Sequence, residues 1–215
     1  MNVAIISDVH CRGESCPGQR EFVAWLADLE ADALWLLGDI FHTGWEFGHR
    51  EQPEYREVYR ALEAVVESGV ELLFVPGNHD FALAGFFQER LGATVSGPHV
   101  RVVDGTRVFL AHGDESDMRV GYRAARSVLR SRVFALFMRF LGVRIGTSLL
   151  RKLAGDFPGT GTVWGSTKIW LKDQIRNADL AIVGHVHVEW SDAGIATLGP
   201  GVKGARRLVD GVLVD

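Results

Sequence analysis

Residues 71–80 have the sequence Glu-Leu-Leu-Phe-Val-Pro-Gly-Asn-His-Asp, an apolar run followed by a Pro-Gly turn and three polar residues. The apolar run predicts a buried strand, at whose end Asn78, His79 and Asp80 present an amide, an imidazole and a carboxylate. In open α/β sheets, binding sites form outside the carboxyl ends of the strands. We therefore predict that a functional site is built around this turn.

Four other apolar runs end in polar motifs of the same kind. They lead into Asp8-Val9-His10, Gly38-Asp39, His112-Gly113-Asp114 and Gly184-His185-Val186-His187. Each motif alone has a simpler explanation, such as a turn, a helix cap or an exposed strand face. Together they predict a metal site, because a pair of divalent ions needs a bridging carboxylate, several imidazoles and harder oxygen ligands.

The spacing within two motifs predicts which side chains lie together. Strand side chains alternate between faces with a period of two, so Asp8 and His10 are expected to share one face. The same rule is expected to place His185 and His187 on one face. Asp39 follows a glycine, which lets neighbouring backbone come close.

The first ninety residues alternate between strand and helix patterns. Strands are predicted at 2–7, 33–37 and 71–75, and helices at 19–30, 53–68 and 81–90. This alternation is typical of βαβ units and predicts a mostly parallel core sheet.

The second half of the chain is richer in strands. Residues 99–103 and 107–111, joined by Asp104-Gly105, predict a hairpin with a tight turn. A Gly-rich linker at 155–165 precedes a helix predicted at 166–178. The C-terminal strands are predicted to form a β-meander, at 180–183, 188–191, 195–198, 206–209 and 212–214.

Composition indicates one soluble globular domain covering residues 1–215, with 47% hydrophobic and 23% charged residues. The chain starts directly with a strand pattern and shows no signal-peptide features, and no apolar run is expected to be long enough to span a bilayer. Cys11 and Cys16 are expected to be two free thiols in a reducing cytosol, in preference to a small disulfide or a weak metal site. We therefore expect a cytoplasmic protein.

The net charge of −4 hides a strong asymmetry. Residues 118–155 contain nine of the 23 basic residues and no acidic one, while the rest of the chain has 14 basic and 27 acidic residues. A basic, apolar segment on an acidic body predicts an anionic partner. Nucleic acid is disfavoured as that partner, because apolar residues alternate with the arginines and the whole chain is acidic.

The ordered series of five motifs resembles the calcineurin-like metallophosphoesterase superfamily, and it spans residues 8–187. The resemblance implies a four-layer αββα sandwich with two mixed β-sheets, which agrees with the predicted βαβ start and strand-rich end. It also implies two divalent metal ions, with Mn preferred and Fe or Zn as alternatives. One metal would be bound by Asp8, His10 and His187 and the other by Asn78, His112 and His185, with Asp39 bridging the two.

The same resemblance implies a reaction and two further site residues. A metal-bound hydroxide would attack the phosphorus directly, without a covalent intermediate. His79 would stabilise the phosphoryl transition state or protonate the leaving oxygen, the alternative being that it only orients another group. Asp80 would hold His79 or its loop, a structural more than a catalytic role.

Two local features resemble the UDP-2,3-diacylglucosamine pyrophosphohydrolases. One is residues 77–87, in which an aromatic residue follows Asp80 and an apolar helix follows that. The other is the position of segment 118–155, where that family has a helical lid over acyl chains. The chain departs from that family at His79, where the family has Arg, and at His42, where it has an acid.

The composition of segment 118–155 fits acyl chains plus phosphate, or the anionic inner face of a membrane. The alternative is a helix pair packed on the body with solvated arginines. The predicted apolar face consists of Val128, Leu129, Val133, Phe134, Leu136, Phe137, Phe140 and Leu141.

Several functions therefore stay open on the sequence. The first is hydrolysis of a phosphodiester or pyrophosphate bond in a phosphate-containing small molecule or lipid-linked nucleotide. The second is a soluble phosphatase or cyclic-nucleotide phosphodiesterase, and the third is a non-catalytic scaffold. His42, Trp45 and His49 either line the substrate cleft or form a surface loop packed on itself.

Overall fold

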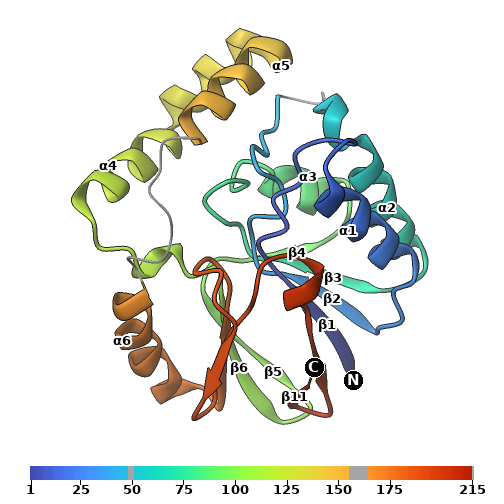
Figure 1. Ribbon diagram of the computed structural model, residues 1–215, viewed down its shortest axis with the longest axis vertical. Helices are drawn as coiled ribbons and strands as arrows, with labels where there is room; N and C mark the ends of the chain where they lie inside the picture. The colour runs from blue at the N-terminus through green and yellow to red at the C-terminus, as the bar shows by residue number, and fades with distance from the viewer. Residues whose placement is uncertain (48–50, 155–163, 215) are drawn as a thin grey trace.

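In the computed structural model, which describes residues 1–47, 51–154 and 164–214, two β-sheets pack face to face. Helices α1 and α2 cover the outer face of one sheet and α6 covers the outer face of the other (Figure 1). Helices α4 and α5 lie beyond the ends of the sheets (Figure 1). This is the predicted α/β fold with two mixed sheets.

The first sheet has the strand order β11-β10-β1-β2-β3-β4. Its strands are β1 (Asn2–Ile6), β2 (Ala33–Leu36), β3 (Glu71–Phe74), β4 (Thr94–Val95), β10 (Arg206–Val209) and β11 (Val212–Val214). Strands β1 to β4 are parallel, as predicted, and β10 and β11 are antiparallel to their neighbours. Side chains on both faces of the central strands are buried, because helices cover one face and the second sheet covers the other. Continuous apolar runs are the expected sequence of such strands.

The second sheet has the order β5-β6-β7-β9-β8. Its strands are β5 (His99–Val103), β6 (Thr106–Ala111), β7 (Leu180–Val183), β8 (Trp190–Asp192) and β9 (Ile195–Thr197). Strands β6, β7 and β9 are parallel, and β5 and β8 are antiparallel edge strands. The hairpin turn has Asp104 and Gly105 at positive φ (49° and 83°), which confirms the predicted tight turn.

The predicted C-terminal meander is wrong. Strand β9 lies between β7 and β8, and β10 and β11 join the other sheet beside β1. The chain changes sheets between Gly199 and Gly204, where a Cβ on Gly204 would lie 2.1 Å from the Gly199 carbonyl oxygen. Two glycines thus allow a close backbone crossing that the strand pattern alone does not reveal.

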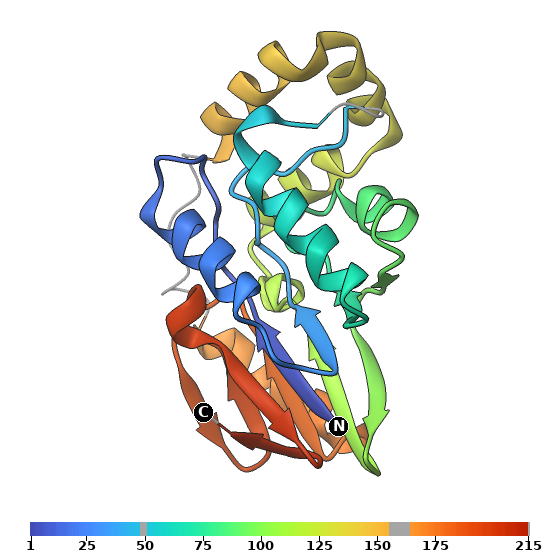
Figure 2. The ribbon, with the colours of Figure 1, turned by 90° about the vertical axis from the view of Figure 1, so that its right-hand side faces the viewer.

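The predicted helices are present with shifted ends. They are α1 (Pro17–Ala27), α2 (Arg56–Glu67) after a 3₁₀ turn η1 (Pro53–Tyr55), α3 (Ala84–Glu89), and α6 (Trp164–Gln174) followed by η4 (Ile175–Asn177). Figure 2 shows α1 and α2 side by side across the first sheet. The predicted linker 155–165 lies outside the described residues except for its last two, which belong to α6.

Helices α4 (Val120–Leu129) and α5 (Arg132–Ala154) occupy the basic segment. Gly142 (φ 69°, ψ 176°) interrupts α5 and divides it into two helical halves. The stretch Arg132–Leu153 is nevertheless long and apolar enough to cross a membrane by length and composition, so the prediction that no segment reaches this length is wrong. The same two properties are shared by helices of soluble proteins, and the kink separates the two halves here.

The predicted apolar face of this segment is divided between two environments. Phe134 and Leu141 pack with Met138 and Leu150 of α5 against Trp45. The remaining large side chains of the face are exposed, except for Leu129, which lines a cavity: Val128, Val133, Leu136, Phe137 and Phe140. The segment therefore both packs on the body and presents apolar side chains outward.

Candidate metal centre

The five sequence motifs meet at one edge of the two sheets, beyond the carboxyl ends of β1, β2, β3, β6 and β7. Backbone hydrogen bonds continue between the loops that follow these strands. The amide of Asp8 donates to the carbonyl of Gly38 (3.0 Å), and that of His10 donates to the carbonyl of Asp39 (2.9 Å). The amide of Gly184 donates to the carbonyl of His112 (2.9 Å) in the same way. The motifs are therefore held side by side by the backbone.

Left-handed backbone, not strand alternation, directs the polar side chains of the site. Strand β1 ends at Ile6, before Asp8 and His10, and β7 ends before His185. Asp8 and His10 nevertheless lie in one cluster, whereas His185 and His187 join different clusters, so the shared face predicted for the two histidines is wrong. Positive φ is uncommon outside glycine, and apart from tight turns it is frequent at functional sites. It occurs at Asp8 (54°), His10 (50°), Asp39 (54°), His185 (65°) and His187 (53°).

Glycines allow the loops to approach closely. A Cβ on Gly38 would lie 2.6 Å from the Gly77 nitrogen and 2.7 Å from His112 Nδ1, which confirms the close approach predicted there. A Cβ on Gly184 would lie 2.4 Å from Asp8 Oδ2. Any side chain at Gly38 or Gly184 would therefore push the site apart.

One cluster consists of Asp8, His10 and His187, as the sequence predicted for one metal. His187 Nε2 lies 3.1 Å from Asp8 Oδ1 and 3.2 Å from His10 Nε2. The other oxygen, Asp8 Oδ2, accepts hydrogen bonds from the Ser7 hydroxyl (2.6 Å) and the His185 amide (2.8 Å). These bonds fix the carboxylate and leave Oδ1 directed toward the two imidazoles.

A second cluster consists of Asp39, His112 and His185, all buried. His112 Nδ1 donates to the carbonyl of Leu37 (2.8 Å), which leaves Nε2 free to act as a ligand. Nε2 lies 3.2 Å from Asn78 Oδ1, so Asn78 adjoins this cluster as predicted. His185 Nε2 is buried and has no hydrogen-bond partner among the described residues. Because buried polar atoms are normally paired, that nitrogen indicates a missing ligand.

The carboxylate of Asp39 lies between the imidazoles of the two clusters. Its Oδ2 is 3.4 Å from His112 Nε2 and 3.8 Å from His10 Nε2. Its Oδ1 accepts the backbone N–H of His79 (2.8 Å). A single carboxylate thus faces imidazoles of both clusters, which is the position expected for a bridging ligand.

The protonation states suit metal binding. Burial lowers the pKa of His10 and of His185 to about 4, so both imidazoles are neutral at pH 7. Burial opposes charge on His112, yet the carboxylate of Asp39 outweighs burial and raises the pKa of His112 well above its ordinary value. Burial likewise opposes charge on Asp39, but nearby imidazoles, His112 first, lower the pKa of Asp39 well below its usual range. A cation would replace the proton that His112 holds.

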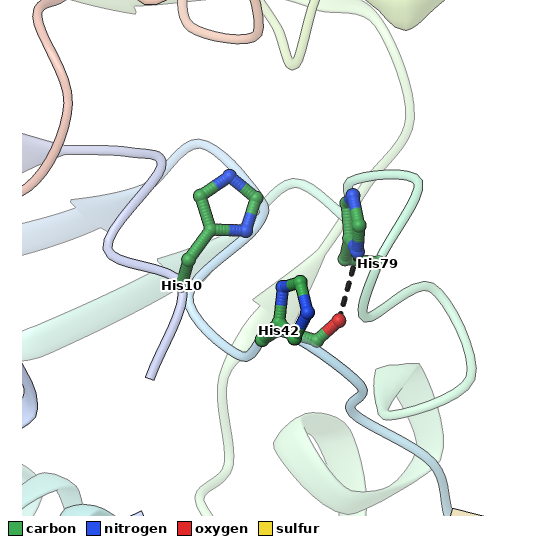
Figure 3. A group of neighbouring side chains, drawn as sticks. All are labelled: His10, His42 and His79. Carbon is green, nitrogen blue, oxygen red and sulfur yellow. Dashed lines mark hydrogen bonds between the residues drawn. The ribbon is translucent and has the colours of Figure 1, made fainter. Parts of the chain in front are cut away.

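Asp80 holds two loops together. Its carboxylate is fully buried and accepts four backbone N–H groups, those of Asp39 (3.2 Å), Ile40 (2.7 Å), Phe41 (3.3 Å) and Gly77 (3.0 Å). No hydrogen bond joins Asp80 to the ring of His79, whose Nδ1 pairs with the carbonyl of His42 (2.8 Å; Figure 3). Of the two roles expected for Asp80, the structure therefore shows support of the loop.

The segment after Asp39 forms one wall beside the site. His42, Thr43 and Trp45 line a cavity of about 50 Å³ together with Asn78 and His79. Its remaining walls are apolar: Phe81, Leu129, Leu150 and Leu153. The sequence left this loop between two interpretations, and the structure places it at the cleft. His49 lies outside the described residues.

Sequence reasoning missed the role of Asp114. Its buried carboxylate accepts hydrogen bonds from the Arg126 guanidinium (2.7 Å) and the Tyr122 hydroxyl (3.0 Å), both on α4. Arg130, the residue directly after α4, lies 4.8 Å from the ring centre of Phe81. Asp114 thus ties α4 to the loop after β6 that carries His112. Its place in the His112-Gly113-Asp114 motif was the available signal.

A model of the family described as calcineurin-like phosphoesterase matches residues 1–189. This chain belongs to that family. The match confirms the predicted family and, with it, the expectation of divalent metal ions, which the two clusters could hold.

Curated relatives of this family member are named UDP-2,3-diacylglucosamine hydrolase. The one from Pseudomonas syringae pv. tomato is 34% identical over 158 residues, which cover 72% of this chain and 63% of that protein. The one from Escherichia coli O7:K1 is 29% identical over 196 residues, covering 88% of this chain and 79% of that protein. The chain thus spans less than two-thirds of the Pseudomonas relative. A solved phosphoesterase from E. coli, Yfce, is 18% identical with a TM-score of 0.46, covering 99% of this chain and 91% of that one.

Proposed function

We propose that this chain is a two-metal phosphohydrolase that cleaves a phosphodiester or pyrophosphate bond in a lipid-linked nucleotide such as UDP-2,3-diacylglucosamine. The observation that carries the proposal is the position of Asp39 between two imidazole clusters. Apolar side chains beside His79 (Phe81, Leu129, Leu150 and Leu153) and the names of the relatives support the lipid-linked substrate. The identity of the bond is inferred from the family.

The residues present fit a pair of divalent ions. Imidazoles, buried carboxylates and the unpartnered His185 nitrogen form the donor set. We assign one ion to Asp8, His10 and His187, the other to Asn78, His112 and His185, and the bridge to Asp39, with Mn preferred over Fe or Zn. When bound, such ions polarise phosphoryl oxygens and lower the pKa of water.

His79 is assigned to the leaving oxygen. A carbonyl can only accept a hydrogen bond, so Nδ1 of His79 must carry the proton in its bond to His42. That bond leaves Nε2 at the edge of the site, 4.0 Å from Asp39 Oδ2. From there Nε2 can hold or donate a proton at an oxygen that leaves the phosphorus.

The basic segment 118–155 is proposed to form a lid within a single domain, and to contact an anionic membrane surface. On α5, Phe140 is 89% exposed and Val133 is 78% exposed. Arg139 and Arg144 lie on the same helix as these side chains, and no ion pair of either is found within the described part of the chain. Exposed apolar side chains interspersed with cations are typical of an interfacial helix. A lipid-linked substrate would be reached from that surface, and we propose that the protein works at the cytoplasmic face of the membrane.

The test is a Mn-dependent turnover assay on UDP-2,3-diacylglucosamine beside bis-p-nitrophenyl phosphate, with Asp39→Ala as the control. We expect UMP release from the lipid, lost in the control variant. Turnover of the chromogenic diester alone would refute the lipid substrate and favour a soluble phosphatase or cyclic-nucleotide phosphodiesterase. Activity on neither, with metal bound, would favour a scaffold.

A further inference from the structure

Ser7 directly precedes Asp8, which forms one metal cluster with His10 and His187. The side chain of Ser7 is fully buried, and its hydroxyl donates to Asp8 Oδ2 at 2.6 Å. Among the described residues, Oδ2 has one further donor, the backbone N–H of His185 at 2.8 Å. Two donors thus occupy one oxygen of the carboxylate. The other, Oδ1, lies 3.1 Å from His187 Nε2 and stays available for a cation.

The hydroxyl of Ser7 is closely confined. A Cβ on Gly184 would lie 2.3 Å from Ser7 Oγ and 2.4 Å from Asp8 Oδ2, so both oxygens lie against the backbone of Gly184. A hydroxyl carries a single proton, and in Ser7 the bond to Asp8 uses it. The hydroxyl therefore acts on the site through Asp8.

The backbone around Ser7 is held independently of this hydroxyl. The carbonyl of Ser7 accepts the N–H of Gly201 at 3.1 Å, in the segment where the chain changes sheets. The amide of Asp8 donates to the carbonyl of Gly38 at 3.0 Å. Loss of the hydroxyl is therefore expected to release the carboxylate of Asp8 while the loop keeps its position.

The orientation of Asp8 matters because its carboxylate is buried, with only 2% of the residue exposed, so solvent does not readily replace a lost donor. Hydrogen bonds to metal ligands orient those ligands, and their loss commonly lowers metal affinity by about 10- to 100-fold. Ligands of the second cluster are held by other groups. The ring of His112 is bonded to the carbonyl of Leu37, and Asp39 Oδ1 accepts the N–H of His79. Neither bond involves Ser7.

We propose that Ser7 is a positioning residue for the ion bound in the cluster of Asp8. Its hydroxyl fixes the carboxylate so that only Oδ1 faces that ion. The inference rests on the proposed two-metal function and deepens it, because it assigns the affinity of one metal position to a residue that is not a ligand. The affinity of the other position does not depend on Ser7.

The test is calorimetric titration of the metal-free full-length chain with Mn²⁺, with the stoichiometry checked by metal analysis. For Ser7→Ala we expect the dissociation constant of one ion to rise by about 10- to 100-fold and that of the other to stay unchanged. Two reference variants identify the ion, since His187→Ala removes a ligand of the first position and His112→Ala one of the second. Ser7→Ala should weaken the ion that His187→Ala loses.

Ser68→Ala is the matched control. Its hydroxyl also makes a 2.7 Å hydrogen bond, to the carbonyl of Val65 at the end of α2, away from the clusters. Both dissociation constants should stay unchanged in this variant. Ser7→Cys keeps a weaker donor and should give an intermediate constant for the first ion, so it decides the question even if Ser7→Ala does not fold.

Melting temperatures are recorded for every variant. A lower melting temperature in Ser7→Ala with both dissociation constants unchanged would assign Ser7 to stability alone and overturn the proposal. Equal weakening of both ions, or weakening only of the ion that His112→Ala loses, would overturn it as well. In all these cases the wild type still binds two ions and the proposed function stands. A wild-type protein that binds fewer than two ions would overturn both.

Discussion

Replacing Asp80 tests whether the site is held by its loops. Asp80→Ala removes the acceptor of four buried backbone N–H groups, at distances of 2.7 to 3.3 Å. A hydrogen bond to a charged group contributes roughly 1.5–3 kcal/mol, and a buried donor left unpaired costs about 1–3 kcal/mol. The four bonds share one carboxylate and are not additive, and removing the buried charge recovers its desolvation cost. The expected loss of unfolding free energy is therefore about 3–5 kcal/mol.

In a domain of this size, 1 kcal/mol shifts the melting temperature by about 2–4 °C. Asp80→Ala should therefore lower it by about 6–20 °C in thermal unfolding followed by circular dichroism. Asp80→Asn keeps one acceptor oxygen and should lose about half as much stability. Asp173→Ala is the matched control, because that carboxylate is exposed and, among the residues that the structure describes, pairs with Arg176 at the surface.

Two results would refute this reasoning. A fall of less than about 3 °C in Asp80→Ala would show that the four bonds do not hold the loops. An unchanged melting temperature and metal content with a thousandfold lower turnover would assign Asp80 to the chemistry.

Three further outcomes are expected from the same structure. Gly38→Ala should cost about 2–4 kcal/mol and lower metal content, whereas Gly92→Ala, also at positive φ but with open space around it, should cost about 1–2 kcal/mol in the same denaturation assay. Metal affinity should rise with pH through the neutral range, because the raised pKa of His112 keeps a proton there that the ion must displace; calorimetry in buffers of different ionisation enthalpy should detect its release. Phe140→Asp should weaken binding to anionic vesicles about tenfold or more. Ile169→Asp, which replaces another exposed apolar side chain but on α6, should leave binding unchanged. Equal binding of both variants would contradict the proposed membrane surface.

The sequence was sufficient to predict that the site residues lie close together. Parallel strands end at the same edge, so apolar runs that terminate in Asp8, Asp39 and Asn78 must meet there. The strands themselves were also predictable, because strands buried on both faces have unbroken apolar sequences. The tight turn was likewise predictable, because the dipeptide Asp104-Gly105 itself favours it.

The pairing of the C-terminal strands and the left-handed backbone conformations of the site were not predictable from the sequence pattern. Nothing local distinguishes β9 paired with β7 from β9 in a meander, because the decision depends on the crossing at Gly199 and Gly204. The positive φ of His185 and His187 separates residues that a period-two rule would keep together. Such conformations are stabilised by surrounding tertiary contacts, which a motif does not contain.

Chemistry and selectivity are carried by different parts of this molecule. The two clusters lie on loops that follow core strands, and these loops are fixed by ladder hydrogen bonds, by close glycine contacts and by Asp80. The cavity beside them takes its walls from the loop at 42–45 and from α4 and α5. Substitutions in those walls can change which group lies beside His79 without moving Asp39. That separation agrees with a family membership that implies divalent metal ions, while we propose that the cavity walls and the helices above them decide the substrate.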